Sequence, residues 1–205
     1  MDTIEVIKKW VERNSEVLDL GCGDGEILKI LSSESESTVM GVEINQEDIN
    51  SCIKSGLNVI QQNIDEGLEN FGDKSFDVVI MSQTIQVLKE PKKALMEVTR
   101  IGKESIVTIP NFGFLSTRLS LLFSGKMPVT GSLPKNWHET DNIHLCTIKD
   151  FEILCNESSI NIIEKRFFNS SGNESLLAKI SPNLFAATAM SVSYTHLTLP
   201  TKVEV

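Results

Sequence analysis

The sequence predicts an α/β fold in which a mostly parallel sheet is covered by helices on both faces. Three observations lead to this prediction. Short, nearly continuous apolar runs alternate with helical patterns along residues 16–109, the runs are β-prone, and the first of them enters a glycine-rich turn followed by a helix. Strands linked by helices in this way are parallel and have right-handed crossovers. Because no internal repeat or linker interrupts the pattern, residues 1–190 are expected to form one domain.

The first half of the chain supplies five of the expected strands. In order, they are residues 16–20, 38–42, 58–61, 76–81 and 105–109. Helices are expected to begin at Glu26, to cover residues 46–54, and to end near Arg100.

The second half is less regular. An apolar helix is expected over 114–123, followed by an ordered loop over 125–137 that is rich in proline and glycine. Thr147 can cap a helix that runs through Cys155, with Asp150 as its capping-box partner. Two further strands are expected, over residues 160–168 and about 184–190.

The last fifteen residues, 191–205, do not fit the pattern. The stretch SYTHLTLPTK at 193–202 resembles translated sequencing-adaptor sequence, so we expect a non-native tail after residue 190. Pro200 also lacks the backbone donor that a central strand needs. Order is therefore expected to end between about Met190 and Tyr194.

Composition and charge restrict the possible partners. The chain of 205 residues carries 19 Lys and Arg against 28 Asp and Glu, a formal net charge of −9. Nucleic-acid binding depends on clustered basic residues, so this balance argues against it and also against docking to an anionic membrane. Membrane and secretory segments are also not expected. No apolar run approaches the roughly 18 residues of a membrane span, and the first residues lack the pattern of a secretory signal. We expect a soluble, cytoplasmic protein in which Cys22, Cys52, Cys146 and Cys155 are free thiols.

The glycine-rich turn is the strongest chemical signal. It reads VLDLGCGDG over 17–25, with Asp19 two residues before the first of the glycines Gly21, Gly23 and Gly25. A dinucleotide fingerprint would place its third glycine where this chain has Glu26, and acidic residues at the helix entrance would repel a pyrophosphate. A cationic ligand without phosphate suits the turn better. The alternatives are a tight strand–helix connection without any ligand and, more distantly, an NAD-binding oxidoreductase.

The turn resembles the glycine-rich motif of class I S-adenosylmethionine-dependent methyltransferases. The resemblance implies that Glu43, after the second strand, takes both ribose hydroxyls, that Asn63 contacts adenine, and that Met81 and Gln83 lie beside the sulfonium. The alternatives are a solvated strand end for Glu43 and no ligand contact for Asn63, where the family usually has Asp. The residues expected to bind S-adenosylmethionine or S-adenosylhomocysteine are Asp19, Gly21, Gly23, Gly25, Glu43, Ile44, Asn63, Ile64, Met81 and Gln83.

Several stretches narrow the resemblance to the MetW family of methionine biosynthesis proteins. They are GLNVIQQNIDEGL at 56–68, SQTIQ at 82–86, IPNFG at 109–113, GKMP at 125–128, LP at 133–134 and NIHLCT at 142–147. The similarity covers about residues 3–190. It implies a Rossmann-like class I methyltransferase fold, with a mostly parallel seven-stranded sheet whose last strand is antiparallel.

The same resemblance implies a role in methionine biosynthesis beside homoserine O-acetyltransferase, whose activity the protein would support. The alternative is an active S-adenosylmethionine-dependent methyltransferase that acts on an unidentified small molecule, and no catalytic residue is assigned. A metal is not expected, because His138, His144 and Cys146 lack the spacing of a zinc site. The apolar and aromatic residues of 112–137 are the expected partner-facing surface, and the alternative is that they cover the ligand-binding site.

Overall fold

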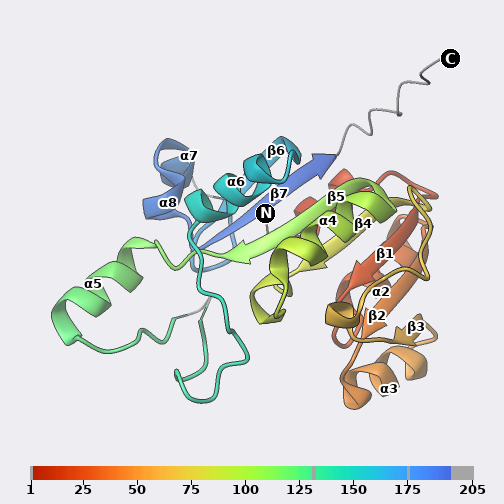
Figure 1. Cartoon of the computed structure of the whole chain (residues 1–205), viewed down its shortest axis with the longest axis horizontal. Coiled ribbons are helices and arrows are strands. Elements are labelled where there is room, and N and C mark those ends of the chain that lie inside the picture. The colour runs from red at the N-terminus through yellow and green to blue at the C-terminus, as the bar shows by residue number, and fades with distance from the viewer. Residues whose placement is uncertain (1, 131–132, 175, 195–205) are drawn as a thin grey trace, which may run out of the picture.

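One sheet organises the chain in the computed structural model, which describes residues 2–130, 133–174 and 176–194 (Figure 1). Its strand order is β3-β2-β1-β4-β5-β7-β6. β1 to β5 pair in parallel, whereas β7 is antiparallel to both β5 and β6. The strands are β1 Glu16–Leu20, β2 Thr38–Glu43, β3 Asn58–Gln61, β4 Phe76–Ser82, β5 Gly102–Pro110, β6 Asn161–Phe168 and β7 Thr188–Tyr194.

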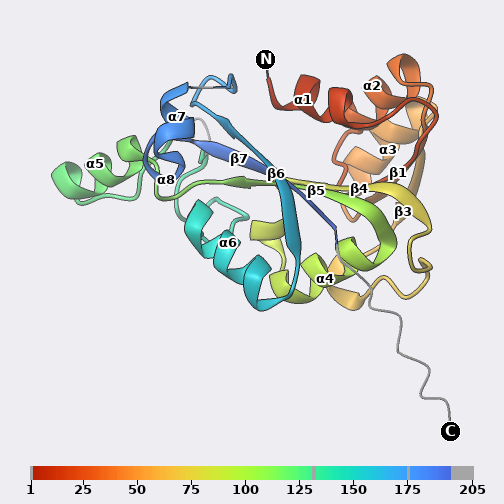
Figure 2. The ribbon, with the colours of Figure 1, turned by 90° about the horizontal axis from the view of Figure 1, so that it is seen from above.

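Helices cover both faces of the sheet, as Figure 2 shows. On one face lie α1 (Thr3–Trp10), α2 (Glu26–Glu34) and α3 (Gln46–Lys54), and on the other α4 (Pro91–Ile101) and α6 (Ile148–Glu157). The remaining helices are α5 (Leu115–Ser124), α7 (Leu176–Ile180), α8 (Pro182–Phe185) and the short 3₁₀ turns η1 (Ile64–Glu66) and η2 (Ile85–Val87). Among the described residues, none of these helices has the length and apolar character needed to cross a membrane.

The two hydrophobic cores follow from the alternation of side chains along the buried strands. Val78 and Ile80 of β4 face the core under α1 and α2, whereas Val79 and Met81 face the core under α4 and α6. Both sets are almost fully buried. A strand buried on both faces must be apolar throughout, which explains the continuous apolar runs in the sequence.

The strand order determines where a ligand-binding crevice is expected. The chain passes from β1 outward to β2 and β3, and then returns to β4 on the other side of β1. Neighbouring connections therefore leave β1 and β4 in opposite directions, and a crevice opens at the carboxyl ends of these two strands. Ligands of open α/β sheets bind at such a switch point.

Most predicted elements are confirmed. The strands over 16–20 and 58–61 and the helix over 46–54 have the predicted bounds, and the capping box of Thr147 and Asp150 opens α6. α1 was not predicted from the sequence, although Asp2 caps it and its Val6 and Ile7 are buried.

The strand predicted over 184–190 was placed wrongly. Residues 182–185 form α8, which begins with Pro182 at a position where a helix tolerates proline, and β7 starts only at Thr188. The interpretation of 191–205 as a non-native tail stays a prediction. Ser191–Tyr194 lie within β7, and 195–205 lie outside the described residues.

One segment projects from the body of the molecule. Residues 114–130, which we call the α5 arm, leave the carboxyl end of β5, and Figures 1 and 2 both show α5 extending away from the sheet. Thr117 is the buried side chain of α5. Gly125, in the left-handed conformation (φ 62°), ends the helix.

Candidate ligand-binding site

The three glycines after β1 have positive φ angles but different surroundings. A Cβ on Gly21 would lie 2.5 Å from Thr84 Oγ1, and one on Gly25 would lie 2.5 Å from Leu57 Cδ1. A Cβ on Gly23 would meet nothing within 4 Å, and Gly23 lines a cavity. Gly21 and Gly25 therefore permit close packing within the protein, whereas Gly23 leaves backbone open to a ligand.

Asp19, at the end of β1, is a buried carboxyl group with an unused oxygen. Its side chain is 1% exposed, and Oδ1 has no hydrogen-bond partner among the described residues. Burial, and secondarily the charge of Glu43, raise the pKa of Asp19 to about 7. A buried acceptor without a partner favours a ligand that brings a hydrogen-bond donor or a positive charge.

Glu43 ends β2 and accepts three backbone hydrogen bonds. Its Oε2 accepts from the N–H of Gly23 at 2.9 Å, and its Oε1 accepts from Ile44 at 2.7 Å and Asn45 at 2.9 Å. The carboxylate therefore joins β2 to the glycine-rich turn and lies in the crevice between β1 and β4. The adjacent Ile44 side chain is 59% exposed and faces the same cavity as Glu43.

Two cavities occupy this edge of the sheet, and they share Gly21, Gln83, Val87 and Asp141. The larger, of about 650 Å³, includes Asp19, Gly23, Asp24, Glu26, Ser82, Gln86 and Thr108. The smaller, of about 550 Å³, includes Glu43, Ile44, Asn45, Asp48, Asn63 and Ile64. The shared residues make them two halves of one cleft.

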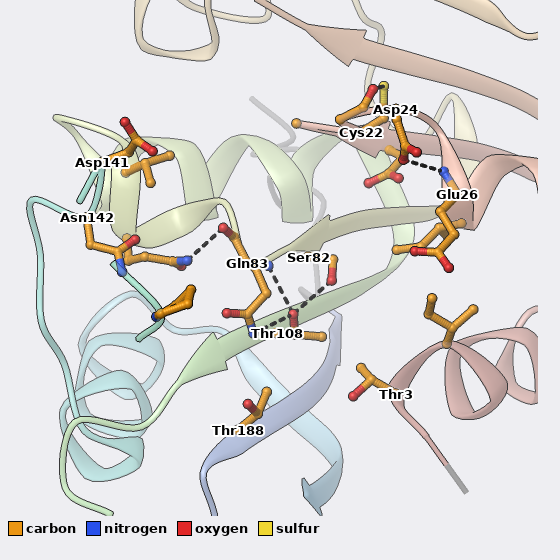
Figure 3. A pocket seen from close by; sticks show the side chains of 18 of the residues that line it. Thr3, Cys22, Asp24, Glu26, Ser82, Gln83, Thr108, Asp141, Asn142 and Thr188 are labelled. Atoms are coloured by element: carbon orange, nitrogen blue, oxygen red, sulfur yellow. Dashed lines mark hydrogen bonds between the residues drawn. The ribbon is translucent and has the colours of Figure 1, made fainter. Parts of the chain in front are cut away.

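Gln83 lies at the centre of the cleft, immediately after β4 (Figure 3). Its φ angle of 55° is unusual for a residue other than glycine. Its backbone N–H donates to the Thr108 carbonyl at 3.2 Å and the Thr108 hydroxyl at 3.0 Å, and that hydroxyl also lies 3.0 Å from Ser82 Oγ. These bonds hold a conformation that tends to occur at functional sites.

A segment remote in sequence closes one side of the cleft. We call residues 133–146 the strap; its Asp141 lines both cavities, and Asn142 lines the larger one. Figure 3 shows both on the opposite side of Gln83 from Asp24 and Glu26.

The strap is held at Gln86. The Gln86 carbonyl accepts the N–H groups of Ile143 and His144 at 3.0 Å each, and its side-chain amide donates to the Gln83 carbonyl at 2.7 Å. The strap is thus connected through Gln86 to the residue at the centre of the cleft.

The other predicted ligand residues are distributed unevenly. Asn63 lines the smaller cavity and caps η1 by accepting the Asp65 N–H at 3.1 Å, and Ile64 lies beside it. The Met81 side chain is fully buried in the hydrophobic core, so only its backbone is available to a ligand. Gly25 lines neither cavity. It packs against Cys52 of α3 and against Leu57, the residue before β3.

The cysteine and histidine side chains are candidates for a nucleophile and for metal ligands. Burial raises the pKa of Cys22, which keeps this thiol protonated and unsuited to nucleophilic attack. Within the described ranges, no three His, Cys, Asp or Glu side chains gather as ligands of a metal ion. His138 and Cys146 both belong to the strap, where Cys146 accepts the Phe112 N–H through its carbonyl.

The family comparison gives a match over nearly the whole chain. The model of the family described as methionine biosynthesis protein MetW matches residues 2–192. A curated relative, the bifunctional methionine biosynthesis protein MetXA/MetW of Rhodopirellula baltica, is 31% identical over 195 residues. That match covers 91% of this chain but 31% of the relative, so the chain spans about a third of the length of the relative.

Several solved structures with the same fold are described as S-adenosylmethionine-dependent methyltransferases. One from Thermotoga maritima, described as a possible histamine N-methyltransferase, has a TM-score of 0.65 at 18% identity, covering 94% of this chain and 87% of that one. Another, from Archaeoglobus fulgidus, has a TM-score of 0.63 at 18% identity, covering 93% and 94%. At these identities the likeness establishes the Rossmann-like methyltransferase fold, including the antiparallel last strand.

Proposed function

The chain belongs to the family of methionine biosynthesis protein MetW, and we propose that it binds S-adenosylmethionine or S-adenosylhomocysteine and supports homoserine O-acetyltransferase. The observation that carries the ligand assignment is the pair of carboxylates at the switch point. Asp19 has a buried, unpartnered oxygen in one half of the cleft, and Glu43 lies in the other half. The two halves suit a ligand with a cationic end and a hydroxyl-bearing end.

The residues of the cleft fit such a ligand in detail. Asp19 would accept from the ammonium group of the methionine part, and Gly23 lets that part approach the backbone without a side chain between them. Glu43 would accept the ribose hydroxyls, and Asn63 and Ile64 would flank the adenine. The bound S-adenosylmethionine supplies an electrophilic methyl group on a sulfonium, and Gln83 and Met81 end β4 beside its expected position.

The partner assignment is supported by the relative whose name joins MetXA and MetW in one bifunctional protein. MetXA is the homoserine O-acetyltransferase part. Fusion of two proteins in one chain keeps each at a high local concentration near the other. A high local concentration strengthens any contact that the two parts make. We propose that this chain makes a contact of the same kind with the acetyltransferase.

A second candidate is methyl transfer to a small molecule. The observation that favours it is the larger cavity, which continues beyond Asp19 to Thr3, Ile4 and Thr188 and offers space beside the ligand. The reaction is an in-line displacement at the methyl group, so the protein mainly has to position the two reactants. Gln83 and Gln86 could orient an acceptor, but amides are not bases, so the acceptor would have to be nucleophilic already.

Calorimetry and an acetyltransferase assay test the proposal. We expect both S-adenosylmethionine and S-adenosylhomocysteine to bind, and the rate of homoserine acetylation to change when this protein is added. Absence of binding would reject the ligand assignment, and an unchanged rate with a bound ligand would reject the supporting role. Transfer of a labelled methyl group into a metabolite extract would establish the second candidate instead.

A further inference from the structure

We propose that the α5 arm is the docking surface for the acetyltransferase, and that it recognises an apolar groove with an acidic rim. The inference rests on the proposed function for the identity of the partner. It assigns a surface whose residues line neither cavity of the ligand-binding cleft, so each can be tested without the other.

The arm exposes large apolar side chains on one face. Leu119, Leu122 and Phe123 follow at helical spacing and are 42%, 73% and 81% exposed, respectively. Met127 and Val129 extend this surface past the end of α5, at 42% and 56% exposure. Contiguous apolar exposure of this kind marks sites of protein–protein interaction.

The arm is attached firmly enough to present this face. At its base, the Arg118 side chain donates to the Gly113 carbonyl at 2.6 Å, and Thr117 is buried. At its far end, Thr130 and Leu133 close a local turn with backbone hydrogen bonds of 2.9 and 3.1 Å, and Leu133 is buried. The arm is therefore anchored at its base, and its far end passes through a turn into the strap.

The charges of the arm indicate the character of its partner. Within the arm, residues 114–130, there is no Asp or Glu, whereas Arg118 and Lys126 are basic, in a chain with a net charge of −9. A surface that is apolar and basic pairs best with one that is apolar and acidic, because complementary charges orient the two proteins.

A second copy of this chain is the other conceivable occupant. The family relationship favours the acetyltransferase, because the Rhodopirellula baltica relative joins a MetXA part to one MetW part. An intramolecular contact in that relative needs an exposed surface on the MetW fold.

The arm also leads directly to the cleft. The Thr130–Leu133 contact joins its end to the strap, and the strap carries Asp141 and Asn142 into the larger cavity. A partner seated on the arm would therefore lie next to the segment that closes the ligand-binding cleft.

The test compares two double variants of the full chain. Leu122→Ser with Phe123→Ser alters the arm, and Leu176→Ser with Ile180→Ser alters α7, whose two side chains are 79% and 80% exposed. Affinity for the purified homoserine O-acetyltransferase of the same organism is measured by biolayer interferometry. Melting temperature, S-adenosylhomocysteine affinity and, by analytical ultracentrifugation, self-association are measured for the wild type and each variant.

We expect the arm variant to lose partner affinity by roughly tenfold or more, because exposed anchors at an interface dominate its binding energy. The α7 variant should bind the partner like the wild type, and both should melt and bind ligand normally. Lys126→Glu should weaken partner binding in the same direction as the arm variant.

Three results would overturn the inference. If the wild type binds the partner and the arm variant binds within twofold of it, the arm is not the docking surface, although the proposed function survives. If the wild type fails to bind at about 50 µM while retaining its ligand, the partner assignment fails as well. If the arm variant abolishes self-association of this protein, the occupant is a second copy.

Discussion

The carboxylate of Glu43 at the end of β2 accepts the backbone N–H of Gly23 in the turn after β1, with Oε2 and N 2.9 Å apart. The residue assigned to the ribose and the residue assigned to the methionine part are thus in direct contact. The conformation of the glycine-rich turn consequently depends on the same carboxylate that is proposed to bind the ligand. Loss of this carboxylate would therefore affect both the turn and ligand binding.

Replacing Glu43 by Ala should weaken S-adenosylmethionine binding by about 1.5–3 kcal/mol, the range for hydrogen bonds to a charged group. Calorimetry measures this change, and the exposed Glu47→Ala on α3 is the matched control for charge. A folded Glu43→Ala protein with affinity within twofold of wild type would contradict the ribose assignment.

Gly23→Val should abolish ligand binding, because the added side chain would project into the larger cavity and the residue has a φ of 54°. Gly56→Val is the matched control. Gly56 also has a positive φ (74°) and open space at its Cβ, but it lines neither half of the cleft. Thermal melting measures the backbone strain of each variant, and calorimetry measures its loss of ligand affinity. Normal ligand binding by a folded Gly23→Val protein would mean that the glycines only permit the turn.

The ionisation of Asp19 makes stability depend on pH. Its pKa is raised from 3.8 to about 7 by burial in the folded protein, so between these values the folded state holds a proton that the unfolded state releases. The free energy of unfolding should therefore fall, relative to Asp19→Asn, from about pH 4 to about pH 7 and then level off. At about 1.4 kcal/mol per pKa unit, the fall is at most about 4 kcal/mol.

Urea denaturation at a series of pH values measures this difference, with Asp24→Asn in the same turn as the charge control. Because a cationic ligand favours the ionised carboxyl group, binding near pH 6 should release a proton. Calorimetry in buffers with different ionisation enthalpies detects that release. A pH-independent difference between wild type and Asp19→Asn would show that the Asp19 carboxyl does not titrate in this range.

Two truncations locate the end of the domain. Removing residues 195–205 should leave the melting temperature within a few degrees, because β7 ends at Tyr194. Removing 191–205 should lower it by roughly 10 °C or more, because the buried residues 191–193 pair with both β5 and β6. A large loss in the first variant would show that residues 195–205 contribute to the fold.

The inner parallel strands, such as β1 and β4, could be predicted closely because burial on both faces leaves a continuous apolar run. The run over 184–190 has the same apolar appearance, but it contains the end of α8 and the start of β7. The apolar pattern does not mark the boundary between this helix and this strand. Pro182 was the available signal, since proline favours the first turn of a helix. α1 could have been found from the spacing of Val6, Ile7 and Trp10 behind Asp2.

The candidate site was predictable where its residues lie at the carboxyl ends of strands, as Asp19 and Glu43 do. The strap was not, because Asp141 reaches the cleft through long-range contacts that no local pattern records. The left-handed backbone of Gln83 was equally hidden, since nothing in a glutamine indicates a positive φ. Thr108, which holds that backbone, has the sequence appearance of an ordinary strand residue.

The position of β7 constrains the order in which the chain can fold. Among the strands of the described residues, β7 is synthesised last, yet it lies between β5 and β6, and within these residues β6 pairs with the sheet through β7 alone. Until β7 has been synthesised, β5 remains an unpaired edge that carries the apolar side chains of Ile106, Val107 and Ile109. Such an edge pairs readily with other chains, so a nascent protein that stalls before Thr188 is exposed to aggregation.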